Sequence, residues 1–378
     1  MPLGVRIPGK TGGVAGYNLG QAKENTMQVG VNYPWFDYGW DFGSPPDSWR
    51  GGEEPVWVAQ LDSDLELFGR IGISAVRWFI FGDGLTYGTG ADAPQFDADT
   101  NRWNFDPPDL SQGFLRNFET LLQKFSDVNS KSSRPILLLP VFIDYKFCEP
   151  GVYAVESQRE GASDTGWIKC GRTQAIIDSQ KRLQFLERAL HPLLELAAKW
   201  YRNTIYAWDI INEPDWVTNN WNPDRRKTHP VEESAMKQFI EESKSMIRSF
   251  GFRPTIGFNA IETIRKSGIH AEINQFHYYS HPGPKGQRKL RKNPFSRRYP
   301  GIIGEFATSS SHDHWPDLDP RPQSVFNRLR FAASQNYGLA LAWSFHDKKY
   351  PDKHSKWSSQ VEREIECFVF GRDCLEKI

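Results

Sequence analysis

The sequence has few cysteines and no paired cysteine motif. Its four cysteines, Cys148, Cys170, Cys367 and Cys374, include no Cys-x-x-Cys pair, which disfavours a structural zinc site. In an oxidising compartment, two local disulfides are possible: Cys148 with Cys170, and Cys367 with Cys374. Four free thiols are the simpler interpretation, because a chain this large can build its core without covalent staples.

The sequence also lacks a long apolar run and an excess of either charge. No window approaches the roughly 18 apolar residues that a membrane-spanning helix needs, so we expect no membrane partner. The 46 basic and 46 acidic side chains cancel, which leaves no global attraction to nucleic acids. The amino terminus, MPLGVRIPGKTGG, lacks the apolar core of a secretory signal. This indicates a cytoplasmic protein or a secreted chain whose leader has been removed.

Several chemical motifs are missing as well. We find no internal repeat, no glycine-rich phosphate cradle and no Ser-His-Asp nucleophile context, so we expect no cofactor. The segment SHDHW at 311–315 contains two histidines and an aspartate. Neighbouring residues of one loop seldom converge on one ion, and we therefore expect no metal site there.

What the sequence does contain is an alternation of short apolar runs and amphipathic segments. Eight runs have the character of buried strands: 27–33, 74–81, 135–143, 204–211, 254–258, 273–279, 301–306 and 338–345. Apolar residues at helical spacing predict helices within 58–72, 114–128, 178–201, 231–250, 322–335 and 358–370. This alternation predicts a (β/α)8 TIM barrel. A doubly wound open sheet is disfavoured, since no glycine-rich turn follows the first strand.

We expect one catalytic barrel domain over residues 1–378, with its core at about 27–346. An amino-terminal extension covers 1–26, and a last helix lies at about 357–370. The connection 280–300 is rich in proline and charge, so the sixth helix is predicted to be degenerate. Connections after the strands are longer than those before them. Such long βα loops lie on the carboxyl-end face of a barrel, where active sites are built.

Two glutamates end predicted strands on that face. The stretch IYAWDIINEP places Asn212 and Glu213 at the end of the fourth strand, and Glu305 lies near the end of the seventh. Three βα units separate the two glutamates, so both carboxylates are expected to face one cleft from opposite sides. Two carboxylates across a cleft are the groups that hydrolyse glycosidic bonds.

These motifs resemble a known family. WDIINEP followed by IIGEF is similar to glycoside hydrolase family 5 and its larger clan, clan A, of retaining β-glycosidases, over roughly residues 27–346. The resemblance implies that Glu213 is the acid/base and Glu305 the nucleophile of a double-displacement reaction on a β-linked oligo- or polysaccharide. Transglycosylation at the same site and a non-catalytic carbohydrate-binding barrel are the alternatives.

The resemblance also implies supporting residues. Arg77 in AVRWF matches the second-strand arginine that hydrogen-bonds the nucleophile, and Tyr279 in FHYY matches a tyrosine that contacts it. His277 is implied to orient the acid/base or the sugar. Asn212 is implied to bind the sugar 2-hydroxyl, and Trp343 in LAWSF to form the floor beneath the cleaved sugar.

The two implied roles require different pKa values. Glu305 must be ionised to attack, and we expect Arg77 and Tyr279 to lower its pKa. Glu213 must carry a proton, and we expect the nearby Glu305 anion and apolar surroundings to raise its pKa.

The third strand departs from the family pattern. The family usually has a histidine or tryptophan there, whereas PVFIDYKF offers an aspartate and a tyrosine. The first strand runs into the aromatic and acidic stretch NYPWFDYGWDFG. The further candidates for substrate contact are Trp35, Asp37, Trp40, Asp144 and Trp216.

A basic segment leaves the sixth strand on the active face. From Lys285 to Arg298, KGQRKLRKNPFSRR carries seven cations and no anion. Solvated surface charge is the simplest interpretation. An anionic glycan is the alternative partner, because carboxylates, sulfates or phosphates would be attracted there. A nucleic-acid partner is not expected, since the net charge is zero.

Overall fold

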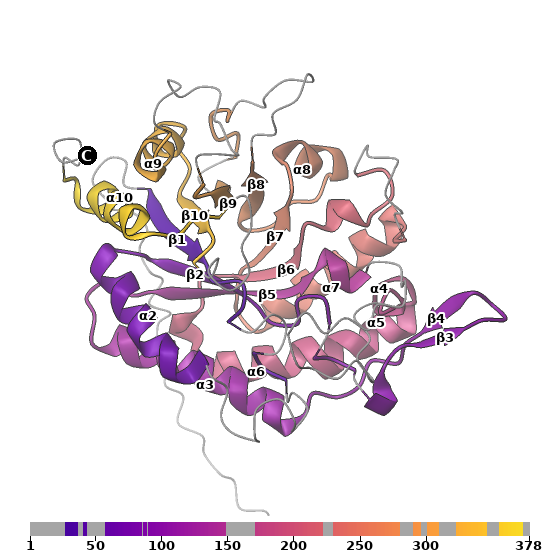
Figure 1. The fold of residues 1–378 in the computed structure, drawn as a ribbon. Helices are drawn as coiled ribbons and strands as arrows, with labels where there is room; N and C mark the ends of the chain where they lie inside the picture. Colours follow the sequence, from indigo (N-terminus) through magenta and orange to yellow (C-terminus); the bar gives the residue numbers. More distant parts are fainter. Residues whose placement is uncertain are drawn as a thin grey trace, which may run out of the picture.

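Eight parallel strands close into a barrel at the centre of the molecule (Figure 1). This computed structural model describes residues 27–36, 41–43, 57–84, 86–88, 90–148, 171–221, 230–279, 290–295, 301–309, 323–345 and 355–372. The barrel strands are β1 (Gln28–Asn32), β2 (Ala75–Phe79), β5 (Leu137–Asp144), β6 (Trp208–Asn212), β7 (Pro254–Phe258), β8 (Asn274–Tyr278), β9 (Gly301–Ala307) and β10 (Leu339–Trp343). They follow the order β1-β10-β9-β8-β7-β6-β5-β2 around the barrel. The predicted (β/α)8 barrel is confirmed.

Helices surround the barrel (Figure 1). They are α2 (Trp57–Ile71), α3 (Gln112–Ser130), α4 (Gln174–Ile177), α5 (Ser179–Phe185), α6 (His191–Trp200), α7 (Glu233–Ser249), α8 (Ile261–Ser267), α9 (Val325–Ser334) and α10 (Ser359–Phe370). Each longer helix turns one apolar stripe inward, as α3 does with Phe114, Phe118 and Leu121. Within the described ranges, no helix is both long and apolar enough to cross a bilayer.

The helix predicted over 178–201 is interrupted. A π-helical turn, Leu186–Leu190, separates α5 from α6. Pro192 follows that turn, and a proline inside a helix has no N–H to donate and clashes with the carbonyl four residues earlier. The wider π turn accommodates the proline. Asp178 caps the start of α5, since its Oδ1 accepts from the N–H groups of Gln180 and Lys181, both at 2.9 Å.

Other segments differ from the expectation in smaller ways. The fourth strand begins at Trp208, not at residue 204, because residues 202–204 form a 3-10 turn closed by the Thr204 hydroxyl on the Tyr201 carbonyl at 2.6 Å. In the connection 280–300, the described residues 290–295 contain no helix, and the rest lies outside the described residues.

A small hairpin, β3 (Gln95–Asp97) and β4 (Arg102–Asn104), was not predicted. It projects from the side of the barrel (Figure 1). Asp97 Oδ1 accepts from the N–H groups of Asp99 and Thr100 at 2.9 and 3.2 Å, so this side chain stabilises the turn.

The barrel interior is layered. Seven apolar side chains fill the layer nearest the amino-terminal ends of the strands: Ala75, Leu139, Ala207, Ile273, Ile302, Leu339 and Leu341. Inward-facing residues recur every second position along a strand. Two residues further along β2, β6 and β8 come Arg77, Asp209 and Gln275, all fully buried. The interior therefore changes from apolar to polar towards the carboxyl ends of the strands.

The cysteines correct one expectation. Cys148 is buried and keeps its thiol, so it forms no disulfide with Cys170. Cys367 on α10 is disulfide-bonded, contrary to the interpretation of four free thiols, and its partner lies outside the described residues.

Candidate active site

The two predicted catalytic glutamates meet at the carboxyl ends of their strands. Glu213 directly follows β6 and adopts a left-handed conformation, with φ 46° and ψ 50°. Its N–H donates to the Gly257 carbonyl at 2.6 Å, and Pro214 begins a 3-10 turn that leads the chain away. Glu305 lies within β9 and is almost fully buried. One carboxyl oxygen of each glutamate lies within 4.8 Å of the other.

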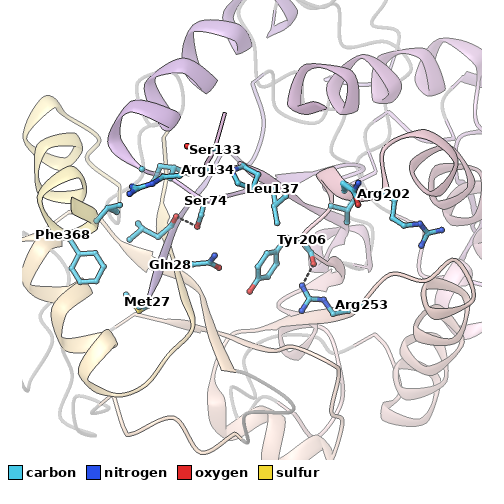
Figure 2. Close-up of a pocket in the computed structure, with 17 residues that line it drawn as sticks. Met27, Gln28, Ser74, Ser133, Arg134, Leu137, Arg202, Tyr206, Arg253 and Phe368 are labelled. Atoms are coloured by element: carbon cyan, nitrogen blue, oxygen red, sulfur yellow. Dashed lines mark hydrogen bonds between the residues drawn. The ribbon is translucent and has the colours of Figure 1, made fainter. Parts of the chain in front are cut away.

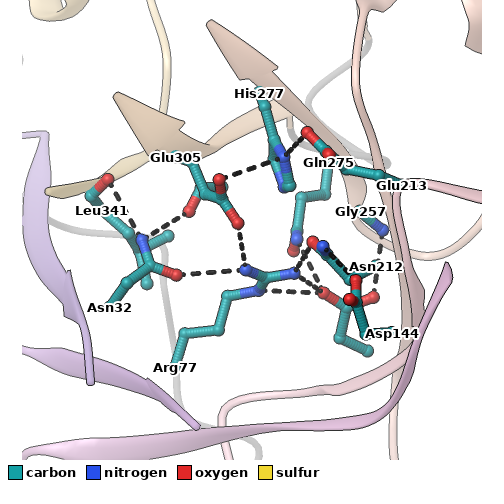
Figure 3. Close-up of polar contacts among 12 residues, drawn as sticks. Asn32, Arg77, Asp144, Asn212, Glu213, Gly257, Gln275, His277, Glu305 and Leu341 are labelled. Carbon is teal, nitrogen blue, oxygen red and sulfur yellow. Dashed lines mark hydrogen bonds and ion pairs between the residues drawn. The ribbon is translucent and has the colours of Figure 1, made fainter. Parts of the chain in front are cut away.

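Glu305 is held by Arg77, Tyr279 and His277, and Figure 3 shows its contacts with Arg77 and His277. Arg77 Nη1 donates to its Oε1 at 2.7 Å, and the Tyr279 hydroxyl donates to its Oε2 at 2.8 Å. His277 Nδ1 lies 3.4 Å from Oε2. Burial raises the pKa of Glu305, whereas His277, Arg77 and Tyr279 lower it. Arg77 and Tyr279 lower this pKa as predicted, but the overall shift is upward, because the prediction left out the cost of desolvating the carboxylate.

Glu213 is engaged at both carboxyl oxygens. His277 Nδ1 lies 2.8 Å from Oε1, and the Trp216 indole N–H donates to Oε2 at 2.7 Å. The predicted elevation of the Glu213 pKa stays a prediction.

His277 is neutral in this site. Burial lowers its pKa to about 4. Its Nε2 is buried and has no hydrogen-bond partner among the described residues. A buried N–H without an acceptor is rarer in proteins than a buried acceptor without a donor, so we assign the single ring proton to Nδ1. His277 then donates to Glu213.

A buried polar network holds Arg77, which in turn contacts Glu305. Arg77 Nε and Nη2 both donate to Asp209 Oδ2, at 3.0 and 2.8 Å. Nη1 also donates to Asn32 Oδ1 at 3.1 Å. Asp209 further accepts from Gln275 Nε2 at 2.8 Å and from the Gly257 N–H at 3.0 Å. These contacts hold the guanidinium in one orientation.

Three members of this network, Asn32, Asp209 and Gln275, were not among the predicted site residues. Each is a buried polar residue of a strand that is buried over most of its length: QVGVN, WDIIN and NQFHY. Burying such a group is costly unless it is hydrogen-bonded, so polar residues within predicted buried strands were the available signal. The signal does not identify the partner.

Asn212 links this network to Asp144 at the end of β5. Arg77 Nη2 donates to Asn212 Oδ1 at 2.7 Å, and Asn212 Nδ2 donates to Asp144 Oδ1 at 2.8 Å. Burial raises the pKa of Asp144 to about 6, although Lys146 and the Asn212 hydrogen bond lower it.

Aromatic candidates lie in two groups. Trp35 makes edge contacts with Phe79 and Trp343, with ring centroids 5.7 and 6.3 Å apart. Trp216 lies 6.3 Å from Tyr145, measured between ring centroids. The predicted candidates Asp37 and Trp40, the 311–315 segment, and all of 285–298 except 290–295 lie outside the described residues.

The chemistry of the cluster does not favour a metal. Glu213, His277 and Glu305 each offer one ligand atom, and these atoms lie within 4.8 Å of one another. A bound cation would have to share Glu305 with the Arg77 guanidinium, which already lies 2.7 Å away. Two cations this close repel each other strongly in a buried site.

A cavity of about 650 Å³ lies at the opposite end of the barrel (Figure 2). Its lining includes Gln28, Ser74, Leu137 and Tyr206, which lie at the amino-terminal ends of their strands. Glu213 and Glu305 lie at the carboxyl ends, so this cavity lies apart from the candidate active site.

The similarities to known proteins lie in the fold. No protein-family profile matches the chain, and no curated protein matches it. A β-1,4-D-mannanase from Cryptopygus antarcticus shares the fold with a TM-score of 0.60 and 17% identity, over 91% of this chain and 90% of that one. A β-mannanase from the blue mussel Mytilus edulis gives 0.58 and 16%, over 91% of each chain. A GH5_18 protein from Bifidobacterium longum, in complex with Manb1-4GlcNAc, gives 0.56 and 10%, over 92% of this chain and 78% of that one. The chain shares the (β/α)8 barrel fold of these three proteins.

Proposed function

We propose that the protein is a retaining β-glycoside hydrolase that cleaves a β-linked oligo- or polysaccharide. The observation that carries the proposal is the approach of the Glu213 and Glu305 carboxyl oxygens to within 4.8 Å. Retaining glycosidases hold their carboxyl groups about 5–5.5 Å apart, and inverting enzymes about 6.5–9.5 Å apart to leave room for a water. The short separation supports direct attack by one carboxylate.

In the proposed reaction, Glu305 attacks the anomeric carbon and forms a glycosyl ester. Glu213 gives its proton to the departing glycosidic oxygen as that bond breaks. Glu213 then takes a proton from water, whose oxygen attacks the anomeric carbon and releases Glu305 as a carboxylate. Arg77 and Tyr279 stabilise the ionised form of Glu305 before attack and after release, and His277 orients Glu213.

Two of the similar structures are named β-mannanases, so β-1,4-mannan is the first polysaccharide to test. An anionic glycan is the second class, based only on the charge of the segment Lys285–Arg298. Transglycosylation uses the same groups, with an acceptor sugar in place of water.

The test is hydrolysis of aryl β-glycosides and a polysaccharide panel, with the anomeric product followed by NMR. We expect a β-configured first product, no turnover by Glu305→Gln, and slow turnover by Glu213→Ala that azide partly restores on substrates with good leaving groups. Glu195→Gln, at an exposed position of α6, is the matched control and should keep full activity. Ordinary activity in either active-site variant would refute the assignment. Tight glycan binding without hydrolysis would favour a carbohydrate-binding barrel.

A further inference from the structure

The amide of Asn212 is held between a group that only donates and a group that only accepts. Arg77 Nη2 donates to Asn212 Oδ1 at 2.7 Å. Asn212 Nδ2 donates to Asp144 Oδ1 at 2.8 Å. A guanidinium has no acceptor and an ionised carboxylate has no donor. The two partners therefore dictate which end of the amide is oxygen and which is nitrogen.

This arrangement leaves one N–H of Asn212 for another molecule. An amide nitrogen carries two hydrogens, and Asp144 uses one of them. Glu213 lies close enough to Asp144, the partner of Asn212, to raise its pKa, so the Asn212 amide lies in the neighbourhood of the proposed acid/base. A sugar hydroxyl oxygen close to the cleaved bond is the kind of acceptor that fits.

We propose that Asp144 is a positioning residue, which acts through Asn212 to present this N–H to a hydroxyl of the sugar being cleaved. The inference rests on the proposed function. It assigns to the carboxylate that ends β5 a role that neither the fold similarity nor the two catalytic glutamates require.

The charges around Asp144 make the role depend on pH. Asp144 is 8% exposed, and burial raises its pKa to about 6. Lys146, which follows β5, lowers that pKa, while Glu213 beyond β6 and Asp83 beyond β2 raise it. Below about pH 6 the carboxyl group carries a proton, so Asn212 Nδ2 loses its charged acceptor and the amide is held less firmly.

Three variants test the inference through activity. Asp144→Leu removes the acceptor, and kcat/KM should fall about 100-fold at pH 7.5. Asp144→Asn keeps an oxygen acceptor that does not titrate. It should be several-fold less active than the wild type at pH 7.5, where the wild-type acceptor is charged, and its activity relative to the wild type should rise as the pH falls through 6. Lys146→Gln should move the acidic limb of the wild-type profile to higher pH.

A second readout does not depend on turnover. The side-chain NH2 signals of Asn212, assigned by their loss in Asn212→Asp, should titrate near pH 6 in the wild type and not in Asp144→Asn. Absence of that titration, or full activity of Asp144→Leu, would overturn the inference. If the titration is present but no glycoside is hydrolysed, the positioning contact stands and the proposed function fails.

Discussion

Glu305 is subject to opposing influences from its surroundings. Burial raises its pKa, while His277, the Arg77 cation and the Tyr279 hydroxyl lower it. The residue must be ionised to act as a nucleophile. The hydrogen bonds that stabilise the carboxylate therefore decide how far the activity extends into acidic solution.

Tyr279→Phe tests this balance. The hydroxyl lies 2.8 Å from Glu305 Oε2, and its removal leaves the carboxylate less stabilised, so the pKa of Glu305 should rise. A hydrogen bond to a charged group contributes about 1.5–3 kcal/mol, which predicts that the acidic limb of kcat/KM moves up by about one pH unit or more. A full pH profile of both proteins measures the shift. An unchanged acidic limb would contradict the prediction.

Arg77 supports the fold as well as the site. It is fully buried and forms ion pairs with Asp209 and Glu305. Arg77→Met leaves both carboxylates without their cation, which should lower the free energy of unfolding by about 3–5 kcal/mol. Arg77→Lys keeps the charge but not the forked geometry, so it should cost less. Urea unfolding measures both variants. Equal losses would show that geometry, not charge, dominates.

At the level of elements, β7 makes room for the network. A Cβ placed on Gly257 would lie 2.9 Å from Arg77 Nη2, 2.9 Å from Gln275 Nε2 and 3.1 Å from Asp209 Oδ2. The backbone of β7 must approach these side chains closely, and a glycine permits this. Position 257 therefore requires a glycine because Arg77 and its neighbours occupy the space that a side chain would need.

Gly257→Ala should displace Arg77 and Gln275. We expect a loss of about 1–3 kcal/mol in the free energy of unfolding, as for overpacked cores, together with a fall in kcat. Gly338→Ala is the matched control, because a Cβ there meets open space. Thermal unfolding and kinetics on both variants provide the comparison. Unchanged stability and unchanged kcat in Gly257→Ala would show that Arg77 and Gln275 can shift to accommodate the added methyl group.

The secondary structure also shows which features the local apolar pattern predicts and which it does not. Apolar runs located all eight barrel strands, because burial on both faces leaves a direct mark in the sequence. The π turn at Leu186–Leu190 and the late start of β6 were missed. Both have local causes that hydrophobic periodicity does not record: Pro192 in the first case, and the hydrogen bond from the Thr204 hydroxyl to the Tyr201 carbonyl in the second.

For the whole molecule, two buried groups oppose each other in the dependence of stability on pH. The pKa of His277 falls from 6.5 to about 4, so between these values the unfolded chain binds a proton that the folded protein does not. Its contribution to stability is lost as the pH falls through this window. The pKa of Asp144 rises from 3.8 to about 6, so the folded protein binds the extra proton and gains stability over nearly the same range.

Asp144→Asn removes one of these two effects. The variant should therefore lose stability more steeply than the wild type between about pH 6 and pH 4. One titrating group changes the slope by at most about 1.4 kcal/mol per pH unit. Urea unfolding midpoints at half-unit pH steps measure the slopes. Parallel curves for the two proteins would mean that Asp144 does not take up its proton in this range.

The sequence by itself determined the barrel class, the order of its strands and the two glutamates at strand ends, because hydrophobic periodicity and strand-end motifs are local properties. Only the tertiary structure decided that Arg77 joins Asn32 of β1 to Asp209 and Asn212 of β6. It also decided that burial outweighs the neighbouring donors at Glu305. Residues far apart in the sequence come into contact, and Glu305 loses its hydration, only when the barrel closes. A local sequence pattern does not contain this information.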